Sequence, residues 1–96
     1  MREQTIQKGI KKVLKIIERM ENTRSIDDIL ENVKITNKLI LEINCFREEN
    51  EKSEYYGEPH MYEIYAIKED NPVDCATISD VRKVESEVMY LLNCYV

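Results

Sequence analysis

Glycine and proline are scarce in this sequence, with two residues of each type among 96. The glycine motifs of P-loops, dinucleotide-binding loops and nucleophile elbows do not occur, and two glycines are too few to build such phosphate-cradling or catalytic loops. The scarcity of both residues leaves little room for flexible linkers. We therefore expect regular structure in a single domain over residues 1–96, because two separate cores would each bury too little apolar surface.

Histidine is limited to His60, and the three cysteines, Cys45, Cys75 and Cys94, lack the spacing of zinc ligands. This pattern predicts free thiols in a reducing compartment, with no metal site, no cofactor and no catalytic residue. We expect Cys45 to be a buried, inert thiol on the apolar side of a strand. An alternative remains open, in which Cys45 or Cys75 pairs with His60 in a small Cys/His-dependent enzyme.

Long apolar runs are also missing. No stretch approaches the roughly 18 uncharged apolar residues that a membrane-spanning helix needs, and the N-terminal segment is charged and amphipathic. We expect a cytoplasmic protein that does not contact membranes.

Acidic residues outnumber basic ones by 19 to 14, which gives a formal net charge of −5. The excess is uneven, because residues 1–20 contain six basic and two acidic side chains and so carry +4, while the remainder carries −9. A basic segment on an acidic body either pairs with that body or faces a different partner.

Residues 6–20 show the periodicity of an amphipathic helix. The apolar stripe consists of Ile6, Ile10, Val13, Leu14, Ile17 and Met20. The opposite side is basic and consists of Lys8, Lys11, Lys12, Lys15 and Arg19. This basic face predicts contact with phosphate groups or an acidic partner, although no aromatic side chain is interleaved with the lysines to stack on bases.

Residues 25–37 predict a second, shorter helix after a break at residues 22–25. Ser25, followed by two aspartates, has the pattern of an N-cap. The apolar side of this helix would consist of Ile26, Ile29, Leu30 and Val33, and its end would lie at Thr36 and Asn37. An alternative continues the same helix through residues 39–46, where loose helical spacing persists.

Period-two alternation predicts a strand over residues 39–45 and another over residues 62–68. Turn residues at 69–72 and a return over residues 73–78 predict a third strand. Thr77 or Ser79 would cap a last helix whose apolar side consists of Val81, Val84, Val88, Leu91, Leu92 and Tyr95. The predicted fold class is α+β, in the order helix, helix, antiparallel meander of two or three strands, helix, with the helices covering one sheet face.

The segment from Arg47 to Glu58 joins negative charge to aromatic surface. Its candidate partner-binding residues are Glu48, Glu49, Glu51, Glu54, Tyr55, Tyr56 and Glu58. Tyrosines offer a large contact area at low entropic cost, and carboxylates steer a basic partner toward them. The alternative is an ordinary solvated hairpin loop with one tyrosine packed inward.

These features predict a small acidic interaction domain without catalytic activity, whose partner is a protein. The sharper hypothesis is an inhibitor or modulator whose acidic surface imitates nucleic-acid charge and occupies the basic groove of a nuclease, polymerase or repressor. Phage-encoded anti-defence proteins, anti-CRISPR proteins among them, have this general size and charge, and the analogy is one of class without any shared motif. The alternative is direct nucleic-acid binding through the basic helix face.

The second sheet face is predicted to carry Ile40, Phe46, Met61 and Ile67. Either the helix over residues 25–37 covers these side chains, or they mediate a homodimer. Ile64 and Leu91 are predicted to lie in the core.

Overall fold

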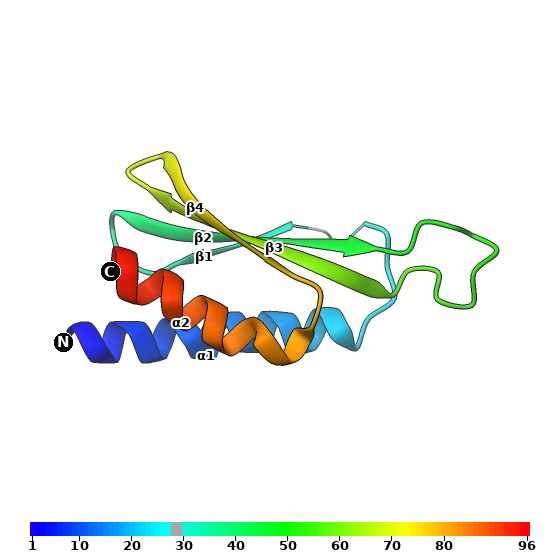
Figure 1. Ribbon diagram of the computed structural model, residues 1–96, viewed down its shortest axis with the longest axis horizontal. Helices are drawn as coiled ribbons and strands as arrows, with labels where there is room; N and C mark the ends of the chain where they lie inside the picture. The colour runs from blue at the N-terminus through cyan, green and yellow to red at the C-terminus, as the bar shows by residue number, and fades with distance from the viewer. Residues whose placement is uncertain (28–29) are drawn as a thin grey trace.

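The computed structural model describes residues 1–27 and 30–96, and it forms a two-layer α+β domain. Its elements are α1 (Arg2–Glu21), β1 (Leu30–Lys34), β2 (Leu39–Arg47), β3 (Pro59–Lys68), β4 (Asn71–Ile78), a short 3-10 helix η1 (Val81–Lys83) and α2 (Val84–Tyr95). The four strands form one antiparallel sheet in sequence order, and both helices lie against the same sheet face (Figure 1). The predicted α+β class and the helix-covered sheet face are confirmed, whereas the predicted count of two or three strands is wrong.

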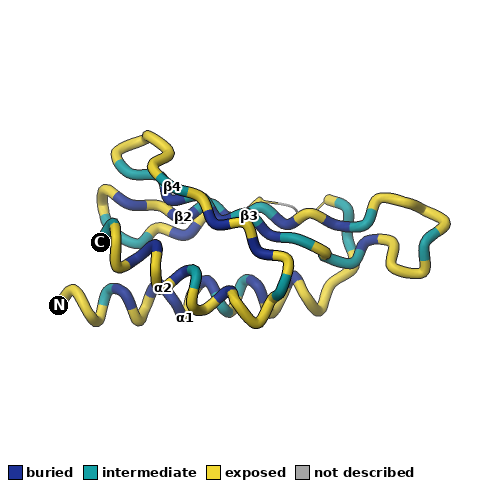
Figure 2. Tube along the Cα trace, in the orientation of Figure 1, coloured by how far each residue is buried: buried dark blue, intermediate teal, exposed yellow. Residues whose placement is uncertain are grey.

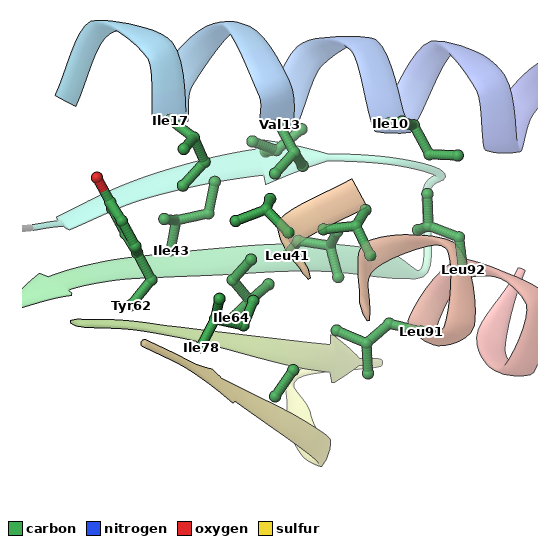
Figure 3. Close-up of a cluster of buried hydrophobic side chains, with 14 of the residues drawn as sticks. Ile10, Val13, Ile17, Leu41, Ile43, Tyr62, Ile64, Ile78, Leu91 and Leu92 are labelled. Atoms are coloured by element: carbon green, nitrogen blue, oxygen red, sulfur yellow. The ribbon is translucent and has the colours of Figure 1, made fainter. Parts of the chain in front are cut away.

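Helix α1 confirms the predicted apolar stripe. Its buried residues are Ile6, Gly9, Ile10, Val13, Ile17 and Met20, and Leu14 is partly buried beside them. In Figure 3 the side chains of Ile10, Val13 and Ile17 point toward the sheet. Burying a side chain of this kind contributes about 1.5 to 3 kcal/mol, so this stripe is what fastens α1 to the sheet.

The predicted helix over residues 25–37 is wrong, because residues 30–34 form strand β1. Val33 pairs with Leu41 and is buried at 4% exposure, whereas Leu30 pairs with Asn44 and is 49% exposed. The Ser25 hydroxyl does accept a hydrogen bond from the Asp27 amide, as a cap would, but the described residues from Leu30 onward form a strand and not a helix. Asp28 and Ile29, which the helix prediction included, lie outside the described residues.

The turn between β1 and β2 occupies the position at which the helix was predicted to end. The Thr36 hydroxyl accepts hydrogen bonds from the amides of Lys38 and Leu39, each at 3.1 Å, and so closes the hairpin. The alternative of a helix through residues 39–46 is also wrong. In β2 every second side chain points into the core, as the strand prediction required. These side chains are Leu39, Leu41, Ile43 and Cys45.

Strands β3 and β4 confirm the rest of the predicted meander. Glu69 and Asp70 both have positive φ values, of 51° and 68°, and form a two-residue hairpin turn. Asn71 already pairs with Lys68, so Asn71 and Pro72 belong to β4 and not to the turn.

The start of the last helical segment differs from the prediction of a cap at Thr77 or Ser79. Thr77 lies within β4, and the Asp80 carboxylate accepts the capping hydrogen bond from the Arg82 amide at 3.0 Å. The hydrogen-bonded Arg82 guanidinium lowers the pKa of Asp80 to about 2.

The core lies between the helices and the sheet, and neither helix of the described residues lies on the opposite sheet face (Figure 1). Ile64 and Leu91 are buried at 0% and 1% exposure, which confirms their placement in the core (Figure 3). Ile40 and Phe46 are exposed on the open face, and Met61 and Ile67 are partly exposed there. The predicted cover of these four side chains by a second helix is therefore wrong, and the homodimer through them stays a prediction.

Candidate partner-binding loop

The β2–β3 loop, residues 48–58, projects beyond the helical layer at the end of α1 that is remote from the N-terminus (Figure 1). Exposed positions dominate its outer part (Figure 2). Tyr55 and Tyr56 are 58% and 38% exposed, so neither ring is buried in the core, and the alternative of an ordinary solvated loop stays open. Five glutamates and one lysine give the loop a net charge of −4.

Arg47 anchors this loop from inside the protein. Its guanidinium donates to the carbonyl oxygens of Thr23 at 2.6 Å, Gly57 at 2.9 Å and Met20 at 3.2 Å. Arg47 is the one buried charged residue in the described part of the chain, at 4% exposure. A cation against the last carbonyls of α1 also interacts favourably with the helix dipole. The loop base is thereby fixed to the end of α1.

Further hydrogen bonds join the two ends of the loop, next to β2 and β3. The Glu48 amide donates to the Glu58 carbonyl, and the Gly57 amide donates to the Glu48 carbonyl, both at 2.9 Å. Gly57 has a φ of +81°, a conformation that other residues rarely adopt, and its carbonyl accepts from the Ser25 amide. The Glu58 carboxylate pairs with the Arg24 guanidinium at 2.6 Å. Of the predicted partner-binding residues, Glu58 therefore belongs to the base of the loop.

The tip of the loop is ordered by short-range turns. The Ser53 amide donates to the Asn50 carbonyl, and the Tyr56 amide donates to the Ser53 carbonyl. The Ser53 hydroxyl accepts a hydrogen bond from the Tyr55 amide at 3.0 Å. These turns hold Tyr55 and Tyr56 outward, while Glu49, Glu51 and Glu54 remain exposed beside them. The structure thus gathers five of the predicted residues on one ordered projection, with Glu48 half-buried at its root.

A hollow of about 460 Å³ lies where the loop meets the open sheet face. Phe46 and Ile26 contribute apolar surface to it, and Glu48, Glu49 and His60 contribute polar groups. An aromatic ring beside two carboxylates suits a lysine or arginine side chain, because the ring face and the carboxylates both attract a cation.

The predicted basic face lies exposed along α1, with Arg19 at the end of the helix nearest the acidic loop. Arg19 pairs with Glu31 of β1 at 2.8 Å. Within residues 1–27 and 30–96, Lys8, Lys11, Lys12 and Lys15 form no ion pair. Pairing with the protein's own acidic body, one of the two interpretations left open by the sequence, therefore does not apply to these four lysines in the described residues.

The Cys–His alternative requires His60 to lie near Cys45 or Cys75, and the structure brings only Cys45 close to it. Cys75 pairs with Tyr65, five positions along β3 from His60, which corresponds to about 16 Å at strand spacing. Partial desolvation and the nearby Glu63 carboxylate raise the pKa of the Cys75 thiol, which opposes formation of a thiolate. Cys45 and His60 line the same hollow, but Cys45 is buried at 2% exposure. The geometry therefore favours the inert thiol at Cys45.

The described residues contain no group of three or more His, Cys, Asp and Glu side chains arranged to hold a metal ion. None of the helices they form is long and apolar enough to cross a membrane. Comparison with protein-family models, with curated proteins and with solved structures finds no match.

Two residues that matter for these surfaces were not identified from the sequence. Arg47 continues the period-two pattern of Leu39 to Cys45, so its inward orientation could have been predicted, but its acceptors in α1 and the loop could not. Lys34 lies beside Lys8 and Lys12 of α1 because residues 30–34 form β1, which pairs with β2. The prediction of a helix over residues 25–37 gave no reason to group Lys34 with these lysines.

Proposed function

We propose that this protein is a non-catalytic inhibitor or modulator that binds a nucleic-acid-handling protein through the β2–β3 loop. The observation that carries the proposal is the combination of an anchored base with an exposed, acidic, tyrosine-bearing tip. An ordered loop loses less conformational entropy on binding than a flexible one, so more of its contact energy appears as affinity.

The chemistry of the loop favours a basic groove as the target. Grooves that track nucleic acid combine lysine and arginine side chains with aromatic or apolar stacking platforms. Glu49, Glu51 and Glu54 offer carboxylates to such cations, and Tyr55 and Tyr56 offer rings to the platforms. The hollow beside Phe46 supplies a second place for a cationic side chain of the partner.

The experiment is capture of partners from a nuclease-treated lysate of the source organism, followed by mass spectrometry. The wild type is compared with a loop variant carrying Glu48→Gln, Glu49→Gln, Glu51→Gln and Glu54→Gln. A control variant carries Glu3→Gln, Glu18→Gln, Glu85→Gln and Glu87→Gln, which remove the same charge elsewhere. Both variants have a net charge of −1, so global charge is matched.

A stoichiometric partner that is retained by the control variant and lost by the loop variant supports the proposal. An equal loss in both variants would assign the interaction to net charge alone. A partner unaffected by either variant would exclude the loop as the binding surface.

A further inference from the structure

Lys34 of β1 extends the basic face of α1 into a cluster built from two elements. A hollow of about 240 Å³ between α1 and β1 is lined by Thr5, Lys8, Gly9, Lys12, Lys34 and Ile35. Three lysines from segments more than twenty residues apart therefore surround one small depression. We call these three residues, Lys8, Lys12 and Lys34, the lysine cluster.

Gly9 explains why the cluster is compact. A Cβ atom at Gly9 would lie 2.9 Å from Cδ1 of Leu92 and 3.0 Å from Cδ1 of Ile35, closer than side chains normally approach. The absence of a side chain lets α1 pack closely against α2 and against the residue that follows β1. Lys8 and Lys12 flank Gly9 along the helix, so this close packing brings them to the same hollow as Lys34.

The charges of the lysine cluster are not neutralised by ion pairs in the described part of the chain. Among the described residues, none of its three ammonium groups forms an ion pair, although the chain has 19 carboxylates. Lys8 and Lys12 are four residues apart on one helix face, a spacing at which like charges destabilise the helix. Three cations gathered in this way are neutralised when an anion binds between them.

We infer that the lysine cluster binds phosphate groups of a nucleic-acid backbone. Lys15 continues the line of Lys8 and Lys12 along α1, and these three positions extend over about 10 Å of helix. One strand of a nucleic acid advances about 3.4 Å for each phosphate, so this line spans about three successive phosphates. Several phosphates in a row are the property of a polymer, whereas the hollow alone would suit a single phosphate.

The acidic loop lies too far from Lys8 and Lys12 for its negative charges to neutralise their positive potential. The loop base is attached at Met20, which is about 12 Å along α1 from Lys12 and about 18 Å from Lys8. Charges separated by more than the Debye length, about 8 Å at physiological ionic strength, are largely screened from one another. The phosphate site therefore works independently of the proposed protein-binding loop, and each can fail without the other.

The test uses fluorescence anisotropy of labelled duplex DNA at increasing salt concentration. The cluster variant carries Lys8→Gln, Lys12→Gln and Lys34→Gln. The control carries Lys38→Gln, Lys52→Gln and Lys83→Gln, so both have a net charge of −8. Circular dichroism verifies that both remain folded. A parallel titration of the ¹⁵N-labelled wild type with inorganic phosphate separates a small phosphate ligand from a polymer.

We expect the wild type and the control to bind DNA with affinity that falls steeply with salt. Removal of three phosphate contacts should reduce the slope of log K against log salt by about 2.7. An equal loss in the cluster and control variants, or no binding by the wild type at low salt, overturns the inference. Amide shifts with inorganic phosphate but no DNA binding overturn the nucleic-acid ligand in favour of a small phosphate.

Discussion

Arg47 is the residue on which the geometry of the candidate loop depends most. Its three hydrogen bonds all go to backbone carbonyls, and these carbonyls belong to α1, to the segment that follows α1 and to the far end of the loop. The Nε atom is buried without a hydrogen-bond partner, so the side chain is held by its terminal nitrogens. A buried charge is tolerated here because three acceptors share it.

Replacement of Arg47 by methionine should lower the free energy of unfolding by about 2 to 4 kcal/mol, because it removes three charge-assisted hydrogen bonds, two of them buried. Urea denaturation followed by circular dichroism measures this change. Arg82→Met is the control, since Arg82 is 86% exposed in its ion pair with Asp80 and such surface pairs contribute at most about 1 kcal/mol. Equal midpoints for the two variants would contradict the anchoring role of Arg47.

Tyr62 provides a second prediction at this scale. Its hydroxyl donates to the Glu21 carboxylate at 2.6 Å, and burial, reinforced by this hydrogen bond, raises the pKa of Tyr62 far above 10. In the unfolded chain the phenol ionises near pH 10, so the stabilisation is complete below that pH and is lost as the pH rises above it. Tyr62→Phe should cost about 1 kcal/mol at neutral pH and should weaken the alkaline loss of stability.

Unfolding free energies measured between neutral pH and pH 11 test the Tyr62 prediction, with the exposed Tyr55→Phe as control. A Tyr62→Phe variant that loses stability above pH 10 as steeply as the wild type would show that Tyr62 is not the responsible group.

At the level of elements, β1 is the clearest difference between sequence pattern and structure. Ile26, Leu30 and Val33 satisfy helical spacing, yet Val33 alone of these three is fully buried. Residues 30–34 form a strand because they pair with β2. This pairing is a contact between two elements, so it produces no periodic pattern in the sequence of residues 30–34 themselves. The stripe of α1 and the alternation of β2 were predictable because each is long enough to show its period several times.

The same contrast holds for the candidate site. The exposed glutamates and tyrosines of the loop could be predicted from composition, since such a charge density cannot be buried. The anchoring of the loop by Arg47 and the convergence of Lys34 with Lys8 and Lys12 could not, because both arise from packing between distant segments.

Two aspartate substitutions distinguish β1 from a helix. Val33→Asp places a charge in the core and should destabilise the protein by more than about 3 kcal/mol, whereas Leu30→Asp should change the stability by less than about 1 kcal/mol. An amphipathic helix would bury both side chains and penalise both changes. Thermal denaturation of the two variants measures the difference, and similar large losses would contradict the strand assignment.

On the scale of the whole molecule, one core holds the two layers together. Ile64 in the sheet and Leu91 in α2 are both fully buried in this core (Figure 3). Ile64→Asp and Leu91→Asp should each unfold the entire domain, since an unpaired charge in the core removes packing for both layers. Near-native circular dichroism and a cooperative melt for both variants would show that the core lies elsewhere.

The molecule is 48 Å long, and its charged surfaces are separated along that length. The acidic loop extends beyond the end of α1, and the lysine cluster lies nearer the start of the same helix (Figure 1). Such a separation allows one face to bind a basic protein and the other to bind phosphate groups without mutual cancellation.

Competition by DNA tests whether the loop occupies a groove of the partner which otherwise holds nucleic acid. Duplex DNA is titrated into the complex of the captured partner with the Lys8→Gln, Lys12→Gln, Lys34→Gln variant, so that DNA cannot act through the lysine cluster. We expect DNA to release the partner in proportion to the DNA concentration, and we expect the released partner to carry the DNA. A complex that stays intact while the partner binds DNA would contradict the claim, because the loop would then bind outside the groove.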